Sequence, residues 1–153
     1  MDSQVEAAML SDLALFQGVE AGVIVKIADD LHRKEVAAGT QLIAAEMPGE
    51  TVFFIVRGSV KIQILRADGS EVTLAVLGAG QMVGEMSLID EAARSADAIC
   101  LEPTTVLWMD RATFRRYLFE PPTLTENLVR ELSHRLRQAR LSRWVIPLSG
   151  NTS

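Results

Sequence analysis

The sequence contains one cysteine, few aromatic residues and no long apolar run. A single cysteine, Cys100, excludes an internal disulfide framework, and its place in an alternating apolar segment indicates a small buried hydrophobic side chain rather than a redox thiol. No apolar stretch approaches the length of a membrane span, and residues 1–6 lack the basic start of a signal peptide. We therefore expect a cytoplasmic protein without membrane contact.

The residues that carry most enzyme chemistry are also scarce. The only two histidines, His32 and His134, are expected in different helices without the spacing of metal ligands. The sequence contains no Cys/His cluster, and it shows neither a Ser-His-acid set nor a nucleophile elbow. The sequence thus predicts a non-enzymatic protein that requires neither a metal nor a cofactor.

Charge is distributed unevenly along the 153 residues, whose net charge is -5. From Arg111 onward the sequence contains eight arginines and three glutamates, which gives a charge of +5 for this segment and leaves -10 for the rest. The acidic total argues against general nucleic-acid binding. A basic C-terminal segment on an acidic body indicates either a helix that faces an anionic partner or a helix that packs on the body of its own chain.

The apolar pattern changes its period along the chain. Residues 3–31 are predicted to be helical, with Ser11-Asp12 as a cap and a second helix over residues 21–31. From Lys34 the period is two, and turn signals separate short strands about ten residues apart, including a hairpin at residues 66–70. Strands spaced this closely favour a β-sandwich or a jelly-roll barrel, whose last strands cover residues 96–101 and 105–109.

Two helices are predicted to follow the strands. Asp110 is a candidate N-cap for a helix over residues 111–119, which Pro121-Pro122 ends. A long helix then begins near Thr123, and residues 146–153 are predicted to be a frayed tail. An apolar seam on the long helix either packs on the barrel or pairs with its copy in a homodimer, and it consists of Val129, Leu132, Leu136, Ala139 and Arg143.

One stretch between the strands has the character of an anion site. Glu85 and Arg94 lie nine residues apart and place a hydrogen-bond acceptor and a fixed cation at the two ends of a short curve. Gly84 has no Cβ, so its backbone can approach a ligand, and the amides of residues 85–88 can bind an anion if they begin a helix. The stretch therefore indicates a loop that holds one phosphate and one sugar hydroxyl, against the alternative of a surface turn with a solvated charge.

Two motifs give the chain a resemblance to a known family. The first is Leu42-Ile43, Gly49, Val52-Phe53-Phe54-Ile55 and Gly58, and the second is Val83-Gly84-Glu85-x-Ser87-Leu88 followed after five residues by Arg94-Ser95-Ala96. They resemble the cyclic-nucleotide-binding domain of bacterial catabolite activator/FNR-type regulators, protein kinase A regulatory subunits and cyclic-nucleotide-gated channels, in which the second motif is the phosphate-binding cassette.

This resemblance implies an α+β, mainly β fold, in which an eight-stranded jelly-roll barrel is flanked by N-terminal helices and two C-terminal helices. It implies one domain over residues 3–144, divided into N-terminal helices (3–33), jelly roll (34–110) and C-terminal helices (111–144), with a flexible tail at 145–153.

The resemblance also implies roles for the cassette residues. Arg94 would pair with the cyclic phosphate, for which a planar guanidinium is well suited, and Glu85 would accept a hydrogen bond from the ribose 2′-hydroxyl. The backbone of Gly84, Met86 and Ser87 would complete the cradle, and Ser95 would add a hydroxyl to the phosphate or the base. These roles agree with the chemistry of the residues themselves.

The base end of the site is less well defined by the sequence. Leu74, expected to point inward on its strand, is a candidate apolar wall for the base. In the bacterial activators a Thr-Ser pair on the long helix contacts the adenine amino group, whereas a gapless alignment places Ala139-Arg140 here. Arg140 or Trp144 would then contact or cap the base, or else form a solvated helix face and a packed end. The expected ligand is cyclic AMP, with cyclic GMP as the alternative.

A second departure from the family is Glu46, which stands where a glycine is usual in the loop before Pro48-Gly49. The bacterial regulators continue into a helix-turn-helix, but this sequence ends at Ser153, so we expect no direct DNA binding. The leading hypothesis is a stand-alone cyclic-nucleotide receptor whose C-terminal helix moves on binding and which signals through a protein partner. The alternatives are the sensor half of, or a degenerate relative of, a dimeric transcription regulator, and a nucleotide-independent interaction module.

Overall fold

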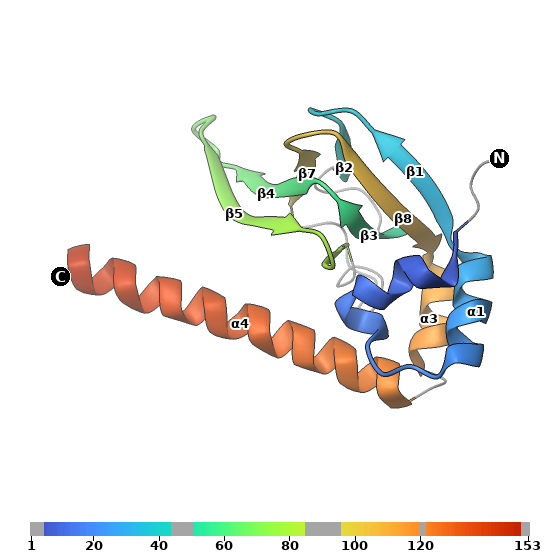
Figure 1. Ribbon diagram of the computed structural model, residues 1–153. Coiled ribbons are helices and arrows are strands. Elements are labelled where there is room, and N and C mark those ends of the chain that lie inside the picture. The colour runs from blue at the N-terminus through green and yellow to red at the C-terminus, as the bar shows by residue number, and fades with distance from the viewer. Residues whose placement is uncertain (1–4, 44–50, 85–95, 120–121, 151–153) are drawn as a thin grey trace.

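Short apolar segments separated by tight turns form the strands of a barrel that rests on a layer of helices (Figure 1). The computed structural model describes residues 5–43, 51–84, 96–119 and 122–150, with side chains up to residue 138 in the last segment. Its described part has eight strands, β1 (His32–Val36), β2 (Gln41–Ile43), β3 (Thr51–Arg57), β4 (Ser59–Leu65), β5 (Glu71–Gly78), β6 (Met82–Val83), β7 (Asp97–Cys100) and β8 (Thr104–Asp110). The predicted eight-stranded jelly-roll fold is confirmed.

The strands form two four-stranded sheets, ordered β1-β8-β3-β6 and β2-β7-β4-β5, and all their pairings are antiparallel. The predicted hairpin joins β4 to β5. Its turn is closed by the Arg66 and Gly69 amides, which donate to Ser70 O and Arg66 O over 2.8 and 3.0 Å, and Gly69 has a φ of 93° that an L side chain rarely adopts. β1 begins at His32, so this histidine lies in a strand and not in the helix that the sequence predicted.

The two faces of the first sheet have different apolar neighbours. One face lines the barrel interior, where Ile55 is buried together with Val60 and Cys100 of the second sheet. The other face packs Val52, Phe54, Leu107 and further side chains against the helices. Cys100 is 1% exposed, so its prediction as a small buried hydrophobic residue is confirmed.

The N-terminal segment is less regular than predicted. Two short 3-10 helices, η1 (Ala7–Asp12) and η2 (Ala14–Phe16), precede α1 (Ala21–Asp30). The Ser11 hydroxyl donates to Ala8 O over 2.8 Å, so Ser11-Asp12 ends a 3-10 turn instead of capping a helix. Buried Leu10, Leu13 and Phe16 hold these turns against the sheet, which explains why helix-like apolar spacing occurs without an α-helix.

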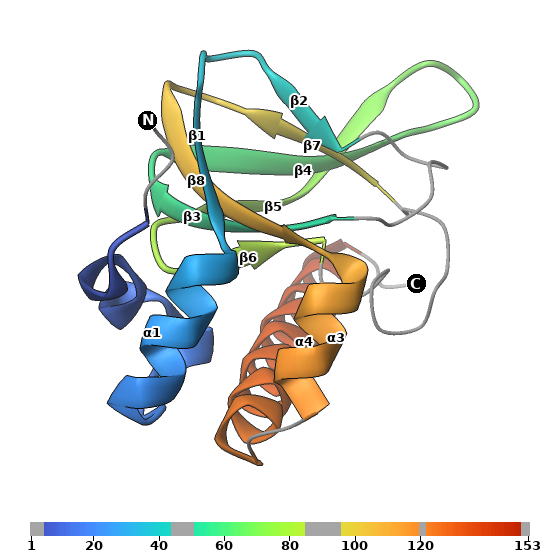
Figure 2. The same ribbon diagram turned by 90° about the vertical axis from the view of Figure 1, so that its right-hand side faces the viewer.

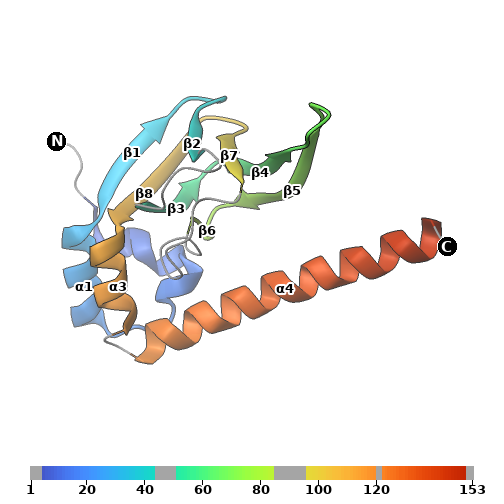
Figure 3. The same cartoon turned by 180° about the vertical axis from the view of Figure 1, so that it is seen from behind.

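Two helices follow the barrel and lie on the same side of it as α1 (Figure 2). α3 (Arg111–Phe119) begins at the predicted cap, because the carboxylate of Asp110 accepts a hydrogen bond from the Thr113 amide over 2.9 Å. α4 (Pro122–Gly150) then runs away from the helix layer and past the edge of the barrel where β5 lies (Figures 1 and 3). Over residues 146–150 the predicted frayed tail is wrong, because α4 continues to Gly150, and residues 151–153 lie outside the described part of the chain.

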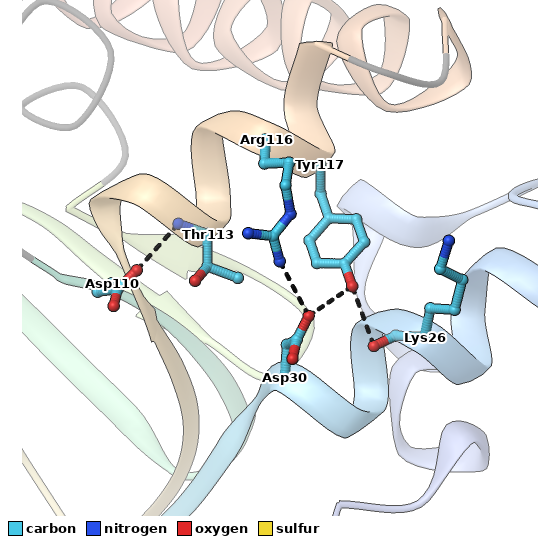
Figure 4. Close-up of polar contacts among 6 residues, drawn as sticks. All are labelled: Lys26, Asp30, Asp110, Thr113, Arg116 and Tyr117. Carbon is cyan, nitrogen blue, oxygen red and sulfur yellow. Dashed lines mark hydrogen bonds and ion pairs between the residues drawn. The ribbon is translucent and has the colours of Figure 1, made fainter.

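A polar contact joins α1 to α3 beneath the barrel (Figure 4). The Tyr117 hydroxyl lies 2.6 Å from Asp30 Oδ2 and 3.1 Å from Lys26 O, and Arg116 Nη2 lies 3.1 Å from the same Asp30 oxygen. Burial, followed by the hydrogen bond to Asp30, raises the pKa of Tyr117. These contacts hold the two helices together, so the segment that leads into α4 starts from a fixed base.

Candidate functional site

The two ends of the anion-site stretch are fixed by different sheets. β6, immediately before it, pairs with β3 at the edge of the first sheet, and β7, after it, lies inside the second sheet. Met82 and Val83 of β6 are 2% and 3% exposed. Gly84 follows with a φ of 92°, a left-handed conformation that a residue with a Cβ rarely adopts. The stretch therefore begins, directly after a buried strand, with a left-handed residue where any side chain with a Cβ would be strained.

The remaining cassette residues lie outside the part of the chain that the structure describes. They are Glu85, Met86, Ser87, Arg94 and Ser95, and Glu46 of the loop before β3 also falls outside it. Of the base-end candidates, Ala139, Arg140 and Trp144 are described by their backbone in α4 only. The assignment of these residues to a ligand stays a prediction.

Leu74 is the one predicted base contact whose side chain is described. The sequence placed it inward on its strand, but the side chain is 56% exposed. The register between β4 and β5 shifts there, because Ile62 pairs with Ala75 whereas Gln63 pairs with Thr73. The extra residue interrupts the inward-outward alternation that the sequence argument assumed, and Leu74 therefore does not belong to the barrel core. Its role as a wall for the base stays a prediction.

A residue of α4 that the sequence analysis did not single out contacts the strand before Gly84. Arg135 Nη2 donates to Met82 O over 2.7 Å, and it lies 3.6 Å from Glu131 Oε2 one helical turn earlier. Both side chains are largely buried, since those of Arg135 and Glu131 are 25% and 14% exposed. The contact joins α4 to the backbone two residues before Gly84.

Nearer its start, α4 is attached to the N-terminal segment. Asn127 Nδ2 donates to Leu15 O over 2.7 Å and to Gln17 O over 2.8 Å, and Asn127 Oδ1 accepts from Arg130 Nη1 over 3.0 Å. Asn127 is 8% exposed. A buried amide that satisfies two backbone carbonyls at the end of η2 fixes the direction in which α4 leaves the helix layer.

A different face of α4 packs inward than the sequence suggested. Leu124 and Leu128 are buried and Leu132 is partly buried, whereas Val129 and Leu136 of the predicted seam are 58% and 63% exposed. The polar residues Asn127, Glu131 and Arg135 lie on the same inward face of α4. The signal was present in the sequence, because Leu124, Leu128, Glu131 and Arg135 follow a three-four spacing, but the charged members concealed it.

Metal-ligating side chains and the single thiol are the other groups of the described residues that bear on chemistry. Among them no three His, Cys, Asp or Glu side chains gather closely enough to hold a metal ion. Burial raises the pKa of the Cys100 thiol, which disfavours the thiolate that a nucleophile needs. No helix in this part of the chain combines the length and hydropathy required to cross a bilayer.

Comparisons with known proteins agree on one family. The profile of the Cyclic nucleotide-binding domain matches residues 33–120. The chain is 32% identical over 130 residues to the CRP-like cAMP-activated global transcriptional regulator of Mycobacterium tuberculosis, covering 85% of this chain and 58% of that protein. It is also 32% identical over 112 residues to the cGMP-dependent protein kinase isozyme 1 of Drosophila melanogaster, covering 71% of this chain and 15% of the kinase.

The fold comparison points the same way. The Catabolite Activator Protein of Thermus thermophilus superposes with a TM-score of 0.76 at 30% identity, over 87% of this chain and 62% of that one. This chain therefore spans somewhat more than half the length of the bacterial regulators that it resembles.

Proposed function

The chain belongs to the cyclic nucleotide-binding domain family, and from this we propose that it is a receptor for cyclic AMP that signals to a protein partner through a change in the position of α4. In this proposal Arg94 pairs with the cyclic phosphate and Glu85 accepts from the ribose 2′-hydroxyl, while the backbone from Gly84 to Ser87 completes the cradle. The protein acts as a sensor and not as an enzyme.

The contact between Arg135 and Met82 carries the proposal for α4. A hydrogen bond from a charged donor typically contributes about 1.5–3 kcal/mol. This one spans 2.7 Å between the helix and the residue two positions before Gly84. A ligand that alters the backbone at Gly84 would thereby favour one position of α4 over another, provided that it binds the two arrangements with different affinity.

Cyclic AMP is preferred to cyclic GMP because of the bacterial relatives. The mycobacterial relative is named as activated by cAMP, whereas the fly relative is named as dependent on cGMP. The first match covers more of this chain than the second, 85% against 71%.

Isothermal titration calorimetry with cyclic AMP, cyclic GMP and cyclic di-GMP tests the ligand. Arg94→Ala should weaken cyclic AMP binding by about 100-fold, because an ion-paired hydrogen bond to the phosphate is worth up to about 3 kcal/mol. Arg66→Ala, on the exposed β4-β5 turn, is the matched control and should bind as the wild type does. Equal affinity of Arg94→Ala and the wild type would refute the phosphate role.

Tryptophan fluorescence tests the movement of α4. The chain has two tryptophans, and Trp108→Phe leaves Trp144 on α4 as the only one. Saturating cyclic AMP should change the Trp144 emission of this variant, and Arg135→Met should reduce that change while the cassette residues remain intact. An unchanged spectrum at saturation would contradict the proposed movement, although not the binding.

The exposure of Val129 and Leu136 favours a second candidate function. A sensor half of a dimeric transcription regulator, or a degenerate relative, would bury these side chains against another copy or against a related chain. Sedimentation with and without nucleotide separates the two functions, because a monomer under both conditions would exclude the homodimer. A nucleotide-independent interaction module is the outcome if none of the three cyclic nucleotides shifts the melting temperature.

A further inference from the structure

The outward face of α4 carries an apolar side chain beside basic ones. Val129 is 58% exposed, whereas Leu124 and Leu128 on the same helix are buried in the core. Arg130, His134 and Arg137 follow at helical spacing on the same outward side. Within the described part of the chain, these exposed side chains leave the outward face of α4 without full cover from the barrel.

This face is hollowed. An open hollow of about 530 Å³ is lined by Glu126, Val129, Arg130, Ser133, His134 and Arg137, together with Thr125. Val129 forms its apolar margin, and Arg130, His134 and Arg137 form the basic margin. Among the described residues of the lining, Glu126 is the only acidic one, so two arginines there are balanced by one glutamate. The hollow is large enough for side chains of a second helix.

The charge of the lining argues against a second copy of this chain as the occupant. In a two-fold pair the same surface of each copy forms the interface, so four arginines would meet two glutamates. Arginines opposite arginines would disfavour pairing with a second copy, whereas a partner that places carboxylates opposite the arginines would be favoured. The chain as a whole has a net charge of -5, so an acidic ligand would be attracted only where basic residues gather.

We propose that the hollow on α4 docks an amphipathic helix of a partner protein, in which carboxylate side chains flank an apolar stripe. This inference rests on the proposed function, since it specifies the chemistry of the protein partner to which α4 signals. The apolar stripe contacts Val129, and the carboxylates pair with Arg137 and Arg130. Leu136, 63% exposed, lies seven residues after Val129, two helical turns along, and extends the apolar contact.

Fluorescence anisotropy with synthetic helical peptides tests the proposal. The probe is a labelled 21-residue peptide with leucine at the first and fourth positions of each heptad and glutamate at the flanking positions; its counterpart carries lysine in place of every glutamate. The glutamate peptide should bind the wild type and should bind more weakly as salt is raised. The lysine peptide should not bind.

Two variants and a matched control locate the contact. Arg137→Glu should weaken the glutamate peptide about tenfold, because a pair attraction becomes a repulsion. Val129→Ser should weaken it about fivefold by removing apolar contact. Arg66→Glu makes the same charge change on the exposed β4-β5 turn and should leave the affinity unchanged. The proposal is refuted if no glutamate peptide binds, if Arg137→Glu binds as the wild type does, or if the lysine peptide binds equally well.

Two further measurements separate the docking of a partner helix from a homodimer and from the cyclic AMP receptor function. If sedimentation shows a wild-type dimer that Val129→Ser dissociates, a second copy occupies the hollow and the proposal is wrong. Calorimetry of the same samples with cyclic AMP reports on the proposed function separately, because Arg137 and Val129 lie on the outward face and their variants should keep nucleotide affinity. Peptide binding without nucleotide binding would overturn the receptor function and leave the docking surface standing.

Discussion

Replacing Asn127 with alanine should destabilise the protein by about 2–4 kcal/mol. The substitution removes the hydrogen bonds of 2.7 and 2.8 Å to Leu15 O and Gln17 O, and also the 3.0 Å bond that Asn127 accepts from Arg130 on the same helix. Each typically contributes about 1 kcal/mol, and a buried carbonyl left without a donor costs about 1–3 kcal/mol more. Leu15 is 3% exposed, so water has little access to replace the lost donor.

The loss is measurable by urea and thermal unfolding. In a chain of this size, 1 kcal/mol shifts the melting temperature by about 2–4 °C, so we expect a fall of roughly 5–15 °C. Asn127→Asp keeps the shape and the bond from Arg130 but replaces the donor with an acceptor, and it should also destabilise the protein. Ser133→Ala, at an exposed position of the same helix, is the control and should stay within about 0.5 kcal/mol of the wild type.

A change of less than about 0.5 kcal/mol for Asn127→Ala would refute this reasoning, since neither hydrogen bond would then contribute measurably. A large loss for Ser133→Ala as well would show that α4 responds to any substitution and that Asn127 has no special role. The expected pattern, with a large effect at one position and almost none at the other, identifies Asn127 as the residue that anchors the start of α4.

Three other expectations follow from contacts in the described structure. Tyr117→Phe should lower the unfolding free energy by about 1–2 kcal/mol, because Asp30 loses its 2.6 Å hydroxyl donor; no loss in urea unfolding would contradict the contact. The Thr113 amide lowers the pKa of Asp110, so the stability that Asp110 contributes is present above its unfolded pKa of about 3.9 and is lost as pH falls through the folded pKa. Asp110→Asn should therefore flatten the acid limb of a stability-against-pH curve, and an unchanged limb would exclude Asp110 as its source. Cys100, 1% exposed with a raised pKa, should react with a thiol reagent only on unfolding, and fast labelling of the native protein would contradict its burial.

The fold was largely predictable because its strands are separated by explicit turn residues. Glycine-containing turns and period-two apolar runs identified the hairpin at 66–70, and Asp110 was identified as the N-cap of the helix after it; both are present. The N-terminal segment was not predictable in the same way. The spacing of Leu10, Leu13 and Phe16 suits both an α-helix and successive 3-10 turns, and packing against the sheet selects between them.

The candidate site shows where local patterns stop being informative. Leu74 was expected to alternate inward, but one extra residue in β5 changes which side a residue faces, and such a bulge leaves no clear mark in the sequence. Arg135 and Asn127 were missed because polar side chains on the inward face of a helix look like solvated positions until their partners are known. Those partners, Met82 O, Leu15 O and Gln17 O, are backbone atoms that carry no sequence signal.

The positions of two contacts on α4 allow a small displacement near the start of the helix to become a larger one at its end. Asn127 and Arg135 hold its first half, and 15 residues separate Arg135 from Gly150 at its end. At about 1.5 Å per residue, Arg135 lies about 12 Å beyond Asn127 and Gly150 about 34 Å beyond it. A tilt of about 5° about Asn127 would move Arg135 by about 1 Å and the end of the helix by about 3 Å. A displacement of about 1 Å at the hydrogen bond to Met82 would thus become a displacement about three times larger at the end of α4, where another protein can detect it.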